Sequence, residues 1–101
     1  MDEEMKRYIE KAIDEMIEEK GDLLGVIEPF LNPLLVESMR DFGLGYMIGG
    51  LKYLGSSLIT MREIKTGRMR HISNEDKLEI QNMIIQRLVS IRERVERELN
   101  R

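Results

Sequence analysis

The stretch from Leu44 to Met61 constrains the fold more than any other part of the chain. Its long apolar side chains recur at alternating intervals of three and four residues, which places them on one side of an α-helix. They are Leu44, Met47, Leu51, Leu54, Leu58 and Met61. The same stretch is flanked and interrupted by Gly43, Gly45, Gly49, Gly50 and Gly55. Each glycine costs a helix about 0.5–1 kcal/mol relative to alanine, so the pattern predicts a helix over 44–66 that another backbone approaches closely.

The end of this helix has an alternative in a β-hairpin. Residues 61–65 could fold back on residues 68–72 across a turn at Thr66-Gly67. Thr-Gly is not a favoured two-residue turn, and the apolar stripe continues without a break through Met61. We therefore expect a helix to about residue 66, and the hairpin stays open as the second interpretation.

The chain on either side of this stretch also predicts helices. Residues 2–20 place apolar side chains on one face and acids in the first turn, where the helix dipole favours negative charge. Two prolines interrupt the following region, so we expect a short helix over 22–28 and another over 33–42. Residues 74–100 carry an apolar stripe with a polar cap before it. The chain of 101 residues is thus expected to be one domain, 1–101, folded as an all-α bundle of four to five helices.

The last helix is longer than a domain of this size needs. A helix over 74–100 would be about 40 Å long, whereas a compact chain of about 100 residues is about 33 Å across. Val95 and Leu99 continue the apolar stripe onto the overhang, where a second copy in a two-fold dimer would cover it. A frayed, solvated end is the alternative. The expected oligomer interface consists of Leu44, Met47, Leu51, Leu54, Leu58, Leu88, Val95 and Leu99.

One short segment is basic in a chain whose net charge is −3. Its members are Arg62, Lys65, Arg68, Arg70 and His71. Together with the N-terminus of the following helix, these cations could contact a phosphate backbone, which would make residues 62–77 a nucleic-acid contact. The aromatic residues typical of single-strand binding are missing, and the first helix is acidic. Ion pairs between this segment and residues 1–20 are therefore the favoured alternative.

Several classes of function are excluded or disfavoured. The chain has no cysteine, which excludes disulfides and thiolate chemistry, and His71 is its only histidine. The spacing of the glycines matches neither the dinucleotide-binding fingerprint nor the P-loop. Lys52, at the centre of residues 42–61, opposes membrane insertion of that stretch. We expect no catalytic, cofactor or metal site, although acid–base catalysis by a carboxylate pair stays open. The N-terminus does not resemble a signal peptide, so a cytoplasmic location is expected, and the composition is compatible with a thermophile.

These observations favour a non-enzymatic module that forms helical homo-oligomers, most simply a dimer, or that binds another protein. A nucleic-acid-binding regulator using residues 62–77 is the alternative. A weaker alternative is a helical bundle that binds a small ligand among methionine side chains. Those methionines are Met47, Met61, Met69 and Met83.

Overall fold

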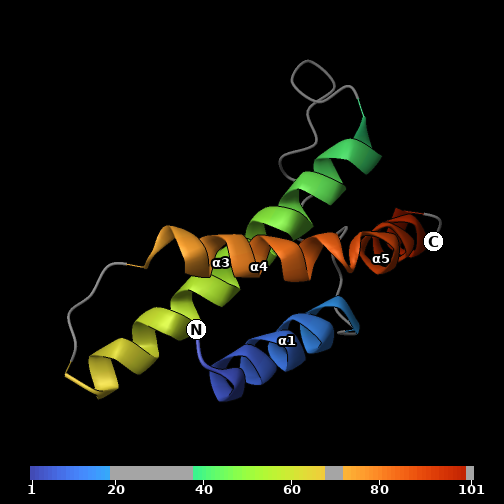
Figure 1. Cartoon of the computed structure of the whole chain (residues 1–101). Helices are drawn as coiled ribbons and strands as arrows, with labels where there is room; N and C mark the ends of the chain where they lie inside the picture. Colours follow the sequence, from blue (N-terminus) through green and yellow to red (C-terminus); the bar gives the residue numbers. More distant parts are fainter. Residues whose placement is uncertain (19–37, 68–71, 100–101) are drawn as a thin grey trace.

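Helix α3, Met39–Lys65, is the longest element and packs against each of the other helices. The structure is a computed structural model, and it describes residues 1–18, 38–67 and 72–99. The other helices are α1 (Glu3–Glu18), α4 (Asn74–Ile85) and α5 (Leu88–Leu99). In Figure 1 the orange α4 crosses the green-to-yellow α3, and the blue α1 lies beneath them. The expected all-α bundle is confirmed, and the described residues contain no strand.

Helix α3 begins at Met39, earlier than the expected start at residue 44. It continues through the boundary that the sequence predicts near residue 43. Ser38 caps it, because its Oγ accepts a hydrogen bond of 3.2 Å from the amide of Asp41. Gly43 is buried inside the helix, where tertiary packing outweighs its poor helix propensity. The helix expected over 33–42 is thus described only from Met39 onward, as the start of α3. The helix expected over 22–28 lies outside the described residues.

The far end of α3 is a helix and not the strand of a hairpin. Helical structure continues to Lys65, and the amide of Thr66 donates a hydrogen bond of 3.1 Å to the carbonyl oxygen of Arg62. Gly67 then takes a positive φ of 73°, a conformation that glycine adopts without steric cost and that commonly ends helices. The hairpin interpretation of residues 61–65 is therefore wrong.

The buried side of α3 is a row with four-residue spacing. It consists of Gly43, Met47, Leu51, Gly55 and Ile59. The expected stripe coincides with this row at Met47 and Leu51 and then diverges from it, so that Met61 is 54% exposed. Other helices pack on both sides of the row, which leaves Leu44 and Leu58 partly buried at its margins.

The glycines of α3 have two different surroundings. A Cβ atom added at Gly55 would lie 2.9 Å from Cγ2 of Ile80, so the backbone of α3 approaches α4 very closely there. A Cβ added at Gly50 would be in ordinary contact with Met16, at 3.4 Å from its Cε. At Gly45 and Gly49 the same atom would have nothing within 4 Å among the described residues. The expected close approach is thus found at Gly55, inside a single copy of the chain.

The single helix expected over 74–100 is divided into two. Helix α4 ends at Ile85, Gln86 and Arg87 form a turn, and α5 begins at Leu88. The turn lets both halves bury apolar side chains in the core, including Ile84 before it and Val95 after it. Val95 is fully buried within one copy, so no straight rod overhangs the bundle and the length argument for a dimer does not hold.

We predict opposite effects of alanine at two glycines of α3. Gly49→Ala should raise the free energy of unfolding by about 0.5–1 kcal/mol, because the helix gains propensity and the new methyl group meets open space. Gly55→Ala should lower it by about 1 kcal/mol, because overpacking against Ile80 costs about 1–3 kcal/mol and exceeds that gain. Urea denaturation of both variants measures the difference. A stabilised Gly55→Ala variant would contradict the close crossing of α3 and α4.

Candidate functional site

Most residues of the expected interface lie inside one copy of the chain. Met47, Leu51 and Val95 belong to the hydrophobic core. Partial burial is found at Leu44, Leu54, Leu58 and Leu99. Leu88 alone is classed as exposed, and it lies directly after the turn between α4 and α5. Leu88 therefore belongs to the outer, solvent-facing side of the two C-terminal helices.

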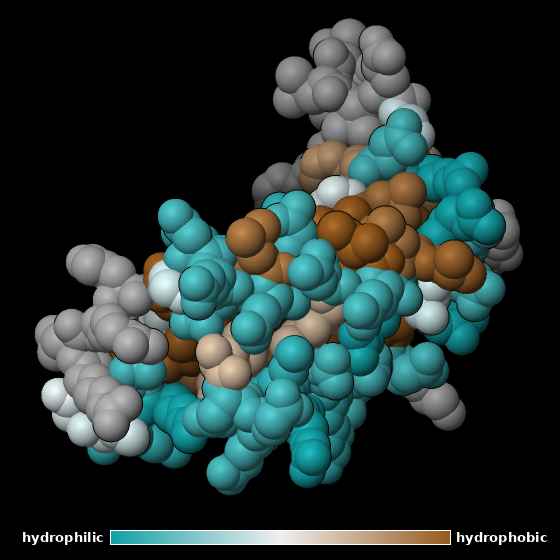
Figure 2. Space-filling model, in the orientation of Figure 1, coloured by the Kyte–Doolittle hydropathy of each residue, from teal (hydrophilic) through white to brown (hydrophobic). Residues whose placement is uncertain are grey.

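The outer side of α4 and the start of α5 form an apolar surface, which we call the α4–α5 face. Its residues follow each other at helical spacing and all face solvent. They are Leu78, Gln81, Asn82, Ile85, Leu88 and Val89. Figure 2 shows hydrophobic surface gathered around the junction of α4 and α5, with hydrophilic surface beyond it. A contiguous exposed apolar patch of this kind is typical of an interaction site.

The α4–α5 face carries no charge in a protein that is 35% charged. Between Leu78 and Ser90 every exposed position is apolar, amide or hydroxyl. The two charged residues in this interval, Glu79 and Arg87, are partly buried. Charges return on both sides, with Lys77 before the face and Arg92 just after it. Protein interfaces have the same anatomy, an apolar centre from which charges are depleted and a polar rim.

Arg87 positions this face by fixing the turn beneath it. Its guanidinium group binds both carboxylate oxygens of Asp14 on α1, at 2.5 Å from Nε and 3.3 Å from Nη2. Nη1 also donates a hydrogen bond of 2.9 Å to the Met83 carbonyl near the end of α4. The hydrogen bond that Arg87 donates to Asp14 raises the pKa of Arg87 above its ordinary value, so the cation is retained at any physiological pH.

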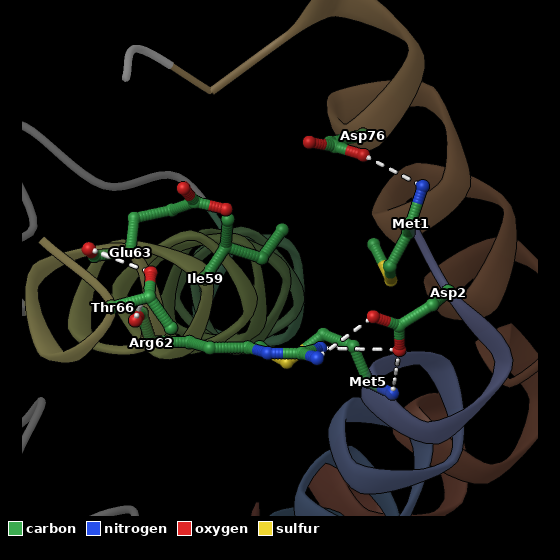
Figure 3. Close-up of a pocket in the computed structure, with 8 residues that line it drawn as sticks. All are labelled: Met1, Asp2, Met5, Ile59, Arg62, Glu63, Thr66 and Asp76. Atoms are coloured by element: carbon green, nitrogen blue, oxygen red, sulfur yellow. Dashed lines mark hydrogen bonds and ion pairs between the residues drawn. The ribbon is translucent and has the colours of Figure 1, made fainter. Parts of the chain in front are cut away.

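A second polar cluster lies where the ends of α1, α3 and α4 meet, as Figure 3 shows. Arg62 of α3 reaches Asp2 at the start of α1, with Nη2 2.8 Å from Oδ2. The α-ammonium group of Met1 lies 3.3 Å from Oδ1 of the buried Asp76 on α4. These groups line a cavity of about 270 Å³, and Glu63 contributes a buried Oε2 atom with no hydrogen bond.

Electrostatics in this cluster are those of a structural junction. The hydrogen bond from Arg62, with a second from the Met5 amide, holds the pKa of Asp2 below its ordinary value of 3.8. Asp2 also accepts the Met5 amide hydrogen at 2.8 Å and thereby caps α1. The two cations and two of the carboxylates in this cluster neutralise each other. Within the described parts of the chain, no three potential ligands are grouped in a way that could hold a metal ion.

The structure describes two of the five residues of the predicted nucleic-acid contact. Arg62 is occupied by Asp2, which agrees with the alternative that the basic segment pairs with the first helix. Lys65 is exposed at the end of α3. Arg68, Arg70 and His71 lie outside the described residues.

The described methionines among those suggested for a ligand pocket have different surroundings. Met47 and Met83 are buried in the core, Met61 lies on the surface, and Met69 is outside the described residues. Arg94 and Glu98 form an ion pair within α5, with Nε 3.2 Å from Oε1, and both residues are buried. Arg94 donates a hydrogen bond of 3.0 Å to the Ile17 carbonyl in the last turn of α1. In the described ranges no helix is long and apolar enough to cross a bilayer.

Comparisons with protein-family models, with curated proteins and with solved structures found no match to this chain.

We predict that the pKa of Asp2 depends on Arg62. In Arg62→Gln the carboxylate loses its strongest hydrogen bond, so its pKa should rise toward 3.8, whereas Lys65→Gln, one turn away, should leave it unchanged. Because the pKa of Asp2 is lower in the folded state than in the unfolded state, its ionised carboxylate stabilises the fold at pH values above the unfolded-state pKa. This stabilisation is lost as the pH falls through the folded-state pKa. NMR titration of the Asp2 carboxylate tests this; an unaltered pKa in Arg62→Gln would refute the link.

Proposed function

We propose that this protein is a non-enzymatic module that self-associates through the α4–α5 face. The observation that carries the proposal is that every exposed position from Leu78 to Ser90 is uncharged, in a chain where about a third of the residues bear charge. Burial of apolar surface supplies most of the free energy of association, and Leu78, Ile85, Leu88 and Val89 provide that surface.

A second copy of the chain suits this face because the face does not repel itself. In a two-fold dimer the same patch lies on both sides of the contact, so any charge at its centre would face a like charge. The polar members of the face are Gln81 and Asn82, whose carboxamides contain both a donor and an acceptor. Identical amides can therefore pair across a two-fold axis.

The rim of the face fits the same arrangement. Lys77 lies before the face, and Arg92 and Glu93 lie beyond it, so exposed charges of both signs border the patch. A border of mixed sign permits opposite charges of two copies to meet when the helices run antiparallel. The contact in such a dimer is the α4–α5 face and not the apolar stripe of α3. Of the residues that the sequence predicts for the oligomer interface, this face contains only Leu88.

We predict that a charge at the centre of the face will dissociate the dimer. Val89→Glu introduces the charge twice in a symmetric contact, and the dissociation constant should rise by at least about tenfold. Ile64→Glu is the matched control, since Ile64 at the end of α3 and Val89 are both 63% exposed. Sedimentation equilibrium gives the association state, and circular dichroism verifies that both variants fold.

Two results would contradict the proposal. The first is a wild-type chain that stays monomeric at high concentration. The second is a dimer that Ile64→Glu disrupts and Val89→Glu does not, because this would place the contact at the end of α3.

A further inference from the structure

Besides the α4–α5 face, the structure contains a basic groove between α3 and α4. It has a volume of about 310 Å³ and lies beside the point where Gly55 lets the two helices cross. The described residues that line it are Lys52, Ser56, Lys77, Ile80 and Gln81. Four of these five side chains can donate hydrogen bonds, and none is acidic.

Neither lysine has an anionic partner among the residues that the structure describes. In residues 1–18, 38–67 and 72–99, no carboxylate lies within 4.0 Å of either ammonium group. Their own helices provide none, because the positions three and four residues away on either side are all uncharged. For Lys52 these positions are Ile48, Gly49, Gly55 and Ser56. For Lys77 they are Ser73, Asn74, Ile80 and Gln81.

Several other cations of the described residues do have a carboxylate partner. Lys11, for example, lies 4.0 Å from Glu15, and Arg40 lies 3.1 Å from Glu96. The overall charge of −3 disfavours general attraction of anions, so binding of an anion here would have to come from the groove itself. Lys52 and Lys77 supply charge, while Ser56 and Gln81 supply neutral donors that can orient oxygen atoms.

We propose that this groove binds the phosphate group of a small phosphorylated molecule, with Lys52 and Lys77 as its charged contacts. The groove has the size of a small-molecule site and is formed by one pair of cations, not by a long basic stripe along which a nucleic-acid backbone could run. This inference does not depend on self-association, although Gln81 belongs to both surfaces.

Titration of the full chain with inorganic pyrophosphate tests the proposal. In two-dimensional amide NMR spectra we expect saturable shifts centred on Lys52, Ser56 and Lys77. The double variant Lys52→Gln with Lys77→Gln should bind at least about tenfold more weakly. The control, Lys6→Gln with Lys11→Gln on α1, removes the same total charge and should keep its affinity within about twofold. Sedimentation of each sample separates a change in binding from a change in association state.

Three outcomes would overturn the proposal. Shifts that do not saturate would show only diffuse attraction. Equal weakening in the control variant would show that net charge, and not the groove, governs binding. Tighter binding of a short single-stranded oligonucleotide than of pyrophosphate, lost in the double lysine variant, would reassign the groove to a nucleic-acid backbone.

Discussion

Helix α1 is held in place by three arginines that come from three other parts of the fold. One guanidinium binds the start of α1, one its middle and one its last turn. These contacts are Arg62 to Asp2, Arg87 to Asp14, and Arg94 to the Ile17 carbonyl. The free energy of packing comes mainly from fully buried side chains such as Ile9 and Ile13, which have no directional preference of their own. The planar, multiply donating guanidinium groups therefore fix the register at which α1 lies in the bundle.

The existence of the helices was predictable, whereas their breaks were not. Capping residues and helical periodicity are local signals, and they indicated the end of α3 near Gly67 and the start of α4 after Ser73. The turn at Gln86 has no proline or glycine to announce it. It is instead held by the contact from Arg87 to Asp14, which is distant in sequence, and no local pattern contains that information.

The candidate interaction surface was only partly predictable for a related reason. Residues 78–91 are apolar on more than one side, so periodicity could not decide which side enters the core. The structure places Ile80, Ile84 and Ile91 inside and leaves Ile85 and Leu88 outside. Charge could not separate the two sides either, because the charged residues of this stretch, Glu79 and Arg87, are partly buried. The groove beside Lys52 required the fold, since only the crossing of α3 and α4 brings Lys77 to it.

The crossing at Gly55 has a consequence for how the sequence can change over time. Where the backbone of one helix touches the branched side chain of another, the space at the two positions is shared. A larger side chain at position 55 requires a smaller one at position 80, so we expect substitutions at these two positions to be accepted as a pair. Lineages that carry a larger residue at the first position should then carry a smaller one at the second, while Gly45, which faces open space, should vary on its own.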